Sequence, residues 1–367
     1  MLIEHKFTIG NEVIPYLIAK DYKSAKNLFV DTRFDRYYIV FDPKIEISQL
    51  LERVFDGLNY HSFALSVSEY NKSFSRLNNL LEELIESSIT RNSCLVAVGG
   101  GIIGNMVGLA AALLYRGISF IHMPTTTIAA ADSVLSLKQA INSSMAKNMI
   151  GTFYAPEFIC TFYPLFKTLP RRDYYAGLVE FVKNVLICGL EHEDFLASYD
   201  YQNFNTYEQL SELIRLSLKI KSDLLADDKF EKGRGIIFEY GHTFGHAVEI
   251  LTKGKINHGE SVAFGMLAAV VTAFNLSLAS YSDIQKHIEL LTFIMPQLSG
   301  IIKLEPQKII SIMKNDNKRG YIAFEADSLP LVLIKTSEKR GCHLVNVPKR
   351  IIEQSIWETC KIISKWQ

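Results

Sequence analysis

Two histidines stand four residues apart in the segment Gly241–Glu249, which reads GHTFGHAVE. On an α-helix, His242 and His246 would lie on one face, one above the other. A third histidine, His258, follows a break at Gly254–Asn257. Neutral imidazole is a common metal ligand, and a catalytic metal site uses three protein ligands and keeps one position open. The pair is not an H-E-x-x-H motif, which excludes a metalloprotease of that type. By itself, the pair favours an ordinary core or surface role.

Charged side chains also stand in apolar surroundings. Glu180 and Lys183 would share one helix face, where the simplest interpretation is a surface ion pair of little energetic value. Asp132 and Lys138 lie among the alanines, leucines and serines of residues 129–140. Three more polar residues flank this stretch: Arg116, Lys147 and Asn148. Because a charge in a place of low polarity is costly unless it is paired or used, this concentration indicates a site.

A glycine-rich turn could bind phosphate. Gly99-Gly100-Gly101 follows the strand-like run Cys94–Val98 and opens a helix-like segment that contains Asn105. Glycines let the backbone approach a pyrophosphate, and the N–H groups and dipole of the helix favour its negative charge. The spacing is not G-x-G-x-x-G, so a simple strand-to-helix turn is about as good an interpretation. Asp42 ends an earlier strand, where it could accept hydrogen bonds from a ribose or merely end the strand before Pro43.

These residues fall on two kinds of secondary structure. In the first part of the chain, strands are predicted at 37–41, 61–67, 94–98 and 119–123, with helices at 48–55, 73–88 and from 103 onward. Such alternation predicts a parallel sheet covered on both faces. After Leu169-Pro170, helical periodicity dominates, over 174–189, 207–225, 241–251 and 260–279. The sequence therefore predicts an α/β domain over residues 1–170 and a mostly helical domain over 171–367.

The composition limits the class of protein. The 367 residues carry 39 Lys+Arg and 39 Asp+Glu, and 48% are hydrophobic, which excludes a disordered chain. A net charge of zero gives no overall attraction to nucleic acid or an anionic membrane. Five scattered cysteines fit neither a disulfide framework nor a zinc–thiolate site, and no signal peptide is visible, so we expect a cytoplasmic protein. Two uncharged stretches, 94–115 and 261–282, are too polar for membrane spans and predict buried core elements.

Together, these segments resemble the sugar phosphate cyclase superfamily, whose best-known member is dehydroquinate synthase. The resemblance covers residues 37–324 and rests on motifs in order: GGGIIGN (99–105), YRGI (115–118), MPTT (123–126), DSVLSLKQAIN (132–142), KNMIG (147–151), GLVEFVKNVLI (177–187), GHTFGHAVE (241–249) and HGESVAFGM (258–266). It implies a Rossmann-like dinucleotide-binding α/β domain, a mostly α-helical C-terminal domain, and an active site between them. It also implies a homodimer that acts on a small sugar phosphate and holds NAD and one divalent metal, Zn²⁺ or Co²⁺.

Residue roles follow from this resemblance, position by position. The metal ligands would be Glu180, His242 and His258. The NAD contacts would be Asp42, Glu69, Lys72, Gly99, Gly100, Gly101, Asn105, Thr125, Thr126, Asp132 and Lys147. The substrate contacts would be Asp132, Lys138, Lys147, Asn148, Lys183, Lys221, Glu239, His246, Lys318 and, from a neighbouring subunit, Arg116. Of these, the catalytic group would be Lys138, Lys183, Lys221, Glu239 and His246.

Departures from the dehydroquinate synthases concern the substrate. Those enzymes carry an Arg and an Asn, respectively seven and three residues before the first motif histidine, where this chain has Gly235 and Glu239. Because that Arg grips a substrate carboxylate, its absence argues against an acid substrate. The runs 135–142, 238–249 and 315–322 instead resemble the branch that cyclises glucose 6-phosphate in aminoglycoside biosynthesis. There, C4 is oxidised and later reduced again, phosphate leaves from C6, and an aldol step closes the ring.

Three alternatives stay open at this point. The chain could be another cyclase, of the dehydroquinate or valiolone type, or an NAD- and metal-dependent alcohol dehydrogenase related to glycerol dehydrogenase. It could also be a non-catalytic subunit, although the intact metal and lysine positions speak against this. Two smaller departures add to the comparison. Asn105 replaces the Asp of dehydroquinate synthases, and Ala146 replaces a glycine before Lys147-Asn148, which would tighten that loop.

Overall fold

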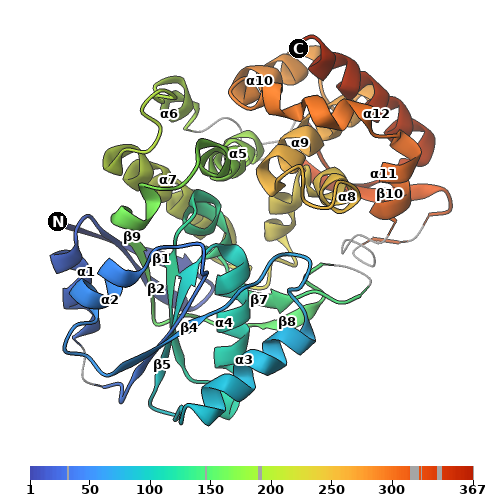
Figure 1. The fold of residues 1–367 in the computed structure, drawn as a ribbon. Coiled ribbons are helices and arrows are strands. Elements are labelled where there is room, and N and C mark those ends of the chain that lie inside the picture. Colours follow the sequence, from blue (N-terminus) through green and yellow to red (C-terminus); the bar gives the residue numbers. More distant parts are fainter. Residues whose placement is uncertain are drawn as a thin grey trace. The chain divides into compact units, whose positions relative to one another are not determined.

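A computed structural model describes residues 1–30, 33–144, 147–188, 192–314, 322–323, 325–336 and 341–366 (Figure 1). The chain divides into two compact units. Unit 1 comprises Met1–Tyr174 and Asn205–Phe230, and unit 2 comprises Tyr175–Phe204 and Glu231–Gln367. Each unit is described separately below.

Unit 1 is built on a seven-stranded sheet with the order β1-β2-β9-β6-β5-β3-β4. Its strands are β1 (Leu2–Ile9), β2 (Glu12–Ala19), β3 (Tyr37–Phe41), β4 (Tyr60–Ala64), β5 (Cys94–Gly99), β6 (Ser119–Pro124) and β9 (Phe158–Phe162). The strand β1 pairs antiparallel with β2, and the remaining pairs are parallel. Because parallel strands need long crossover connections, helices return the chain across both faces.

The side chains of the central strands divide between the two faces. On β3 and β5, Tyr38 and Leu95 pack into one core, with residues of α3 (Phe74–Glu86) and α4 (Gly101–Leu113). Their neighbours Ile39 and Val96 pack into the opposite core. That second core also contains residues of α1 (Tyr22–Phe29) and α2 (Ser48–Val54). Successive strand residues point to opposite faces of the sheet. Because these strands are apolar at nearly every position, both faces of the sheet are apolar, and helices cover both (Figure 1).

Unit 1 also contains elements outside the seven-stranded sheet and the helices α1 to α4. A π-helical turn, η2 (Ala129–Ser133), precedes the antiparallel hairpin of β7 (Lys138–Ile141) and β8 (Ile150–Phe153). Two 3₁₀ turns are η1 (Leu114–Arg116) and η3 (Tyr163–Phe166). The helix α7 (Tyr207–Leu225) packs against β1 and η2. It therefore belongs to unit 1, whereas the sequence division at residue 170 grouped it with the helical half.

Unit 2 is mostly helical. Its helices are α5 (Arg171–Ile187, which begins at the end of unit 1), α6 (Glu193–Ala197), α8 (His242–Leu251), α9 (His258–Asn275), α10 (Tyr281–Leu291), α11 (Pro306–Met313) and α12 (Lys349–Ser364). Two 3₁₀ segments, η4 (Arg234–Glu239) and η5 (Met295–Lys303), and the hairpin of β10 (Ser328–Ile334) and β11 (Cys342–Pro348) complete it.

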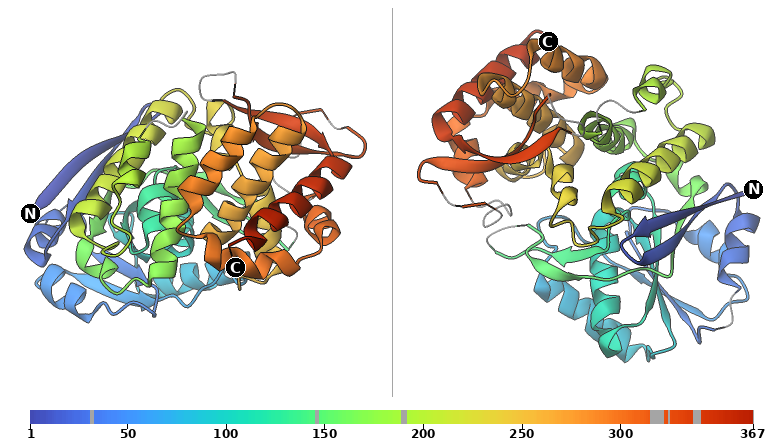
Figure 2. Two further views of the ribbon diagram at one scale, coloured as in Figure 1. Left: turned by 90° about the horizontal axis from the view of Figure 1, so that it is seen from above. Right: turned by 180° about the vertical axis from the view of Figure 1, so that it is seen from behind.

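The helix α9 is the centre of unit 2. It is contacted by α8, α10, α12 and β10, among which it runs in Figure 2. Every residue from Gly259 to Ala273 is buried. A helix enclosed on all sides is apolar all round, which explains the uncharged residues 261–273. The prediction that the whole stretch 261–282 is a buried element was wrong for residues 274–282, which are half-buried or exposed because α9 ends at Asn275. Among the described residues, no helix is long and apolar enough to cross a membrane.

Candidate functional site

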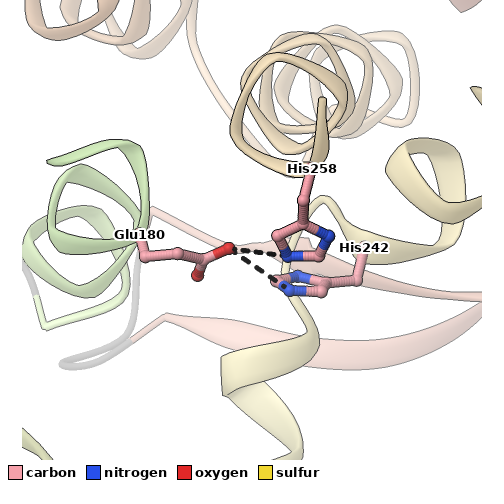
Figure 3. Close-up of side chains that lie close together, drawn as sticks. All are labelled: Glu180, His242 and His258. Atoms are coloured by element: carbon pink, nitrogen blue, oxygen red, sulfur yellow. Dashed lines mark ion pairs between the residues drawn. The ribbon is translucent and has the colours of Figure 1, made fainter. Parts of the chain in front are cut away.

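Three side chains converge in unit 2 (Figure 3). Glu180 comes from α5, and His242 and His258 are the first residues of α8 and α9. Glu180 Oε1 lies 3.2 Å from His258 Nε2 and 3.6 Å from His242 Nε2. One ligand atom from each residue lies within 4.8 Å of the other two. Two imidazole nitrogens and one carboxylate oxygen therefore face a common point, as in a three-ligand metal site.

Close backbone packing brings α5 and α9 together at this point. A Cβ atom at Gly259 would lie 2.3 Å from Ala176 Cα, so a residue larger than glycine would force the two helices apart. The first turn of α9 is also fixed by a capping box, in which Asn257 Oδ1 accepts from Glu260 N and Glu260 Oε2 accepts from Asn257 N, both at 2.9 Å. Ala176 precedes Glu180 by one turn of α5, so these contacts hold His258, at the start of α9, close to the carboxylate of Glu180.

The charges around Glu180 are buried. Glu180 is 0% exposed, and the Nζ atom of Lys183, itself 1% exposed, lies 2.5 Å from Glu180 Oε2. Burial alone would raise the pKa of Glu180, but Lys183, His242 and His258 hold the pKa well below its usual range. The sequence suggested a surface ion pair at these positions. The structure corrects this, because the pair lies in the core, where an ionised carboxylate is costly without a cation.

The Nδ1 atom of each of these two histidines faces an oxygen atom that orients the ring. His242 Nδ1 lies 3.1 Å from the carbonyl oxygen of Tyr240, and His258 Nδ1 lies 3.2 Å from Glu249 Oε2. A carbonyl or carboxylate at Nδ1 favours the tautomer whose Nε2 lone pair is free for a metal. Both Nε2 atoms point towards Glu180, so the donor set and its orientation fit a divalent cation.

The two histidines differ in their proton affinity. Burial, together with Lys183, lowers the pKa of His242 to about 3. Burial also lowers the pKa of His258, but hydrogen bonds with Glu180 and Glu249 outweigh it and raise the pKa to about 10. The imidazole of His258 thus lies between two carboxylates. A divalent cation would bind it in its deprotonated form, as metal binding requires.

Other predicted residues of unit 2 lie near this cluster. The ring centroid of His246 lies 5.3 Å from that of His242 and 6.2 Å from that of His258. Glu239 ends η4, three residues before His242, and its charge acts on His242 to raise the pKa of that imidazole against the effect of burial. Lys318 and Ala146 lie outside the described residues.

The predicted nucleotide contacts of unit 1 follow neighbouring strands. Asp42 comes after β3, the glycine turn after β5 and Thr125 after β6, and these three strands are adjacent and parallel. Glu69 lies in the loop after β4, the next strand along. The carboxyl ends of parallel strands share one edge of a sheet, which is where such folds bind nucleotides. The structure thus places at one edge the residues that the sequence could only suggest one by one.

The glycine turn leaves the start of α4 accessible. The N-cap of α4 is Gly100, which has no side chain to accept from the first-turn N–H groups, as a phosphate oxygen would. A Cβ atom at Gly100 would approach no closer than 3.5 Å to Thr126, whereas one at Gly99 would lie 2.6 Å from Ile103 Cβ. The side chain of Asn105 hydrogen-bonds two backbone groups here. Its Nδ2 donates to Gly101 O at 2.8 Å, and its Oδ1 accepts from Ala140 N at 3.0 Å.

A hydrogen-bond network links two loops beside this edge. Asn142 Nδ2 donates to Glu69 Oε1 at 2.8 Å, and Asn142 Oδ1 accepts from Asn148 N at 2.8 Å. Lys72 Nζ, from a buried side chain, donates to Asn148 Oδ1 at 2.6 Å, and Lys147 Nζ lies 4.0 Å from Glu69 Oε1. Sequence reasoning quoted Asn142 within a motif but gave it no role. Asn148 has a φ of 53°, a left-handed conformation that Asn tolerates better than most residues.

The remaining predicted residues of unit 1 have different surroundings. Asp132 lies in the π-helical turn η2, and Lys221 Nζ, from α7, lies 2.9 Å from Asp132 Oδ1. Lys221 is 4% exposed, so its charge is also held in the core. Lys138 is exposed at the start of β7. Arg116 is exposed and has a φ of 69°, and the φ of the preceding residue, Tyr115, is 52°. The side chain of Arg116 therefore extends into solvent from a strained turn.

Comparison with known proteins identifies the family. The profile of the 3-dehydroquinate synthase N-terminal domain matches residues 62–176, and that of the C-terminal domain matches residues 177–319. A 2-deoxy-scyllo-inosose synthase from Niallia circulans is 36% identical over 345 residues, which cover 92% of this chain and 94% of that protein. The chain belongs to the 3-dehydroquinate synthase family. The resemblance found in its motifs is thereby confirmed.

Solved structures of the family agree with the fold. A crystal structure of 2-deoxy-scyllo-inosose synthase complexed with carbaglucose-6-phosphate, NAD⁺ and Co²⁺ is 33% identical, with a TM-score of 0.89 over 97% of this chain and 100% of that one. A 2-epi-5-epi-valiolone synthase from Streptomyces hygroscopicus, with NAD⁺ and Zn²⁺ bound, is 19% identical, with a TM-score of 0.81 over 98% and 99% of the two chains. At that identity the second comparison supports the fold alone. The predicted α/β unit and helical unit of the 3-dehydroquinate synthase fold are confirmed.

Proposed function

We propose that this chain is a 2-deoxy-scyllo-inosose synthase, a carbon–oxygen lyase that converts D-glucose 6-phosphate into a carbocyclic ketone and inorganic phosphate. The observation that carries the proposal is the near full-length similarity to enzymes of that name, including one crystallised with a substrate-like carbasugar phosphate, NAD⁺ and Co²⁺. Such enzymes make a carbocyclic precursor for the biosynthesis of aminoglycoside antibiotics. No water or external reductant enters the balance, because the ketone and phosphate together contain every atom of the sugar phosphate.

Glu180, His242 and His258 would hold one divalent metal. The Nε2 atoms of a buried and a half-buried histidine, together with a carboxylate oxygen, suit Zn²⁺ or Co²⁺. When bound, the metal would act as a Lewis acid that lowers the pKa of a sugar hydroxyl. Lys183 keeps Glu180 ionised, and the carbonyl of Tyr240 keeps the Nε2 atom of His242 directed at the ligand position. His246, beside both ligands, would bind substrate or move a proton at its imidazole.

The strand-end edge of unit 1 would hold NAD, which supplies the hydride acceptor and donor of the reaction. Asp42 would accept hydrogen bonds from the adenosine ribose, with Glu69 and Lys72 beside it. The first-turn N–H groups of α4 would bind the pyrophosphate, next to Thr125 and Thr126. Asn105 would contribute indirectly, by fixing Gly101 relative to β7.

Departure of the phosphate requires positive charge. Lys183 and Lys221 are suited to this role because both ammonium groups are buried, each beside a carboxylate, and a positive charge in a medium of low polarity stabilises a developing anion strongly. Lys138, Lys147, Asn148 and Lys318 would add contacts to the sugar phosphate. Arg116 would reach a phosphate from a neighbouring subunit of a homodimer. The dimer, this trans contact and a cytoplasmic location stay predictions.

Glu239 would select the substrate. Its carboxylate lies close enough to His242 to act on the pKa of that ligand, so it would repel a substrate carboxylate and accept from a sugar hydroxyl. We expect Glu239→Asn combined with Gly235→Arg, which restores the dehydroquinate synthase residues, to abolish glucose 6-phosphate turnover while the protein still binds metal. Near-normal kinetics in the double variant would contradict this role.

The activity itself is tested with the full chain, glucose 6-phosphate, NAD⁺ and Co²⁺. Phosphate release with formation of a cyclic ketone, and no net increase in NADH absorbance, is the expected result. Accumulation of NADH without phosphate release would instead identify an alcohol dehydrogenase related to glycerol dehydrogenase. Substrate profiling with other sugar phosphates separates the remaining cyclases.

A further inference from the structure

A half-buried carboxylate faces the Nδ1 atom of one of the proposed ligand histidines. Glu249 Oε2 lies 3.2 Å from His258 Nδ1, on the side of the imidazole opposite Glu180. The side chain of Glu249 is 12% exposed and that of His258 is 32% exposed. The imidazole of His258 therefore bridges two carboxylates, one at each nitrogen.

Glu249 reaches His258 from a different helix. It lies in the last turns of α8, whereas His258 begins α9 after the intervening turn. The capping box of Asn257 and Glu260 fixes the backbone of His258, but it leaves rotation of the imidazole about its side-chain torsions unconstrained. The contact with Glu249 supplies that constraint, since rotating the ring would break the hydrogen bond at Nδ1.

The two ligand histidines are thus oriented by acceptors of different charge. The neutral carbonyl of Tyr240 holds His242, whereas an ionisable carboxylate holds His258. A carboxylate at Nδ1 makes Nε2 a stronger donor to a metal than a carbonyl does, and such outer partners typically change metal affinity by about 10–100-fold. His258 is also the more exposed ligand, so its ring has less packing to hold it.

We propose that Glu249 is a positioning residue for the metal centre: it fixes the ring and tautomer of His258 and strengthens that histidine as a ligand. Glu249 does not touch the metal or the substrate in this assignment. The inference rests on the metal binding included in the proposed function, and it adds a residue that the three-ligand description leaves out.

The test measures metal binding directly. Full-length protein is stripped of metal with a chelator, and Co²⁺ affinity is determined by competition with a chromophoric chelator. The variants are Glu249→Ala, which removes the acceptor, and Glu249→Gln, which keeps its shape and an amide oxygen but removes the charge. The matched control is Glu289→Gln on α10, where a 68% exposed carboxylate pairs with Lys286 at 3.3 Å. The visible absorption of bound Co²⁺ reports its ligand geometry.

We expect Glu249→Ala to weaken Co²⁺ binding by about 10–100-fold and to change the Co²⁺ spectrum, and Glu249→Gln to cause a smaller loss in the same direction. NAD affinity and the Glu289→Gln control should match the wild-type protein. Wild-type Co²⁺ affinity and spectrum in both Glu249 variants would overturn this inference and leave the proposed function intact. Failure of the wild-type chain itself to bind Co²⁺ would overturn both.

Discussion

Unit 2 gathers ionisable side chains in the core around its proposed metal site, whereas the proposed pyrophosphate site of unit 1 consists of backbone N–H groups and small side chains at a sheet edge. In unit 2, Glu180 and Lys183 are both buried beside two histidines. In unit 1, the glycine turn contributes N–H groups, and Asn105 acts by tying two backbone positions together. A buried charge requires a partner of opposite charge, whereas an uncapped helix start favours an anion.

The difference predicts different sensitivities to mutation. A site of charged ligands should fail when one side chain is removed, because no neighbour can replace the lost donor. A site of backbone donors should tolerate many side-chain changes but respond to those that move the backbone. The following predictions test this contrast, in order of decreasing effect.

The largest effect is expected from His242→Ala. Loss of one of the three proposed metal ligands should remove the bound metal and lower turnover by about 10³-fold or more, since Lewis-acid stabilisation is worth several kcal/mol. Metal content by mass spectrometry and the rate of phosphate release check this. NAD affinity should stay near that of the wild type. A variant that lost NAD as well as metal would show that the two sites are not separable in this way.

A smaller effect is expected from Gly259→Ala. The added methyl group would lie 2.3 Å from Ala176 Cα and force α5 away from the start of α9, which separates Glu180 from His258. Overpacking of this kind typically costs about 1–3 kcal/mol of stability. The metal affinity should fall on the order of tenfold or more, as for other changes that disturb ligand orientation.

The control for this variant is Gly300→Ala, where the new methyl group would meet the end of the Ile256 side chain at 3.2 Å. Thermal unfolding and Co²⁺ titration of both variants provide the comparison. Equal metal affinity in Gly259→Ala and the wild type would show that this helix contact does not set the ligand spacing.

In unit 1, Asn105→Ala should act through the backbone. It removes hydrogen bonds to Gly101 O and Ala140 N, each worth about 0.5–1.5 kcal/mol. We expect NAD affinity, measured by fluorescence titration, to fall about tenfold, which corresponds to ~1.4 kcal/mol. Metal content should be unchanged. Loss of metal with unaltered NAD binding would reverse the roles given to the two units.

The smallest predicted effect is the loss of stability at acidic pH. Each unit buries a histidine whose pKa is lowered by burial: His122 in unit 1, to about 3, and His287 in unit 2, to about 4. Below the unfolded pKa of 6.5, the unfolded chain gains a proton that the folded chain does not, so stability falls as the pH falls towards the folded pKa. The loss approaches about 1.4 kcal/mol per pH unit for each histidine.

Denaturant unfolding between pH 6.5 and pH 4.5 checks this prediction. His122→Gln and His287→Gln should each show a shallower fall of stability with pH than the wild type, even if their stability at neutral pH is lower. Identical slopes in all three proteins would contradict the assignment of buried, neutral histidines.

Much of the fold followed from the sequence. The predicted strand over 37–41 is β3, and the helix predicted over 207–225 is α7, because long periodic segments carry a strong local signal. The location of α7 could not be predicted, since amphipathicity shows that one face is buried but not against what. That face packs on β1, a strand that the sequence analysis did not assign.

The metal cluster illustrates the same limit. The spacing of His242 and His246 alone favoured an ordinary core or surface role for the pair. Only the family resemblance predicted that His242 binds a metal together with Glu180 and His258. The structure brings these three together within 4.8 Å, although α5 precedes α8 by more than fifty residues of chain. Glu249 lay within a recognised motif, but its contact with His258 depends on how α8 and α9 meet, and no local pattern encodes that packing.

The central claim is that one chain oxidises, eliminates and reduces within a single turnover. The most direct test is to supply glucose 6-phosphate deuterated at C4 together with NAD⁺ and Co²⁺, and to analyse the product by mass spectrometry. We predict that phosphate is released, that NADH does not accumulate, and that the cyclic ketone keeps its deuterium. Release of the label into the nucleotide pool, or an absence of phosphate release, would contradict the account.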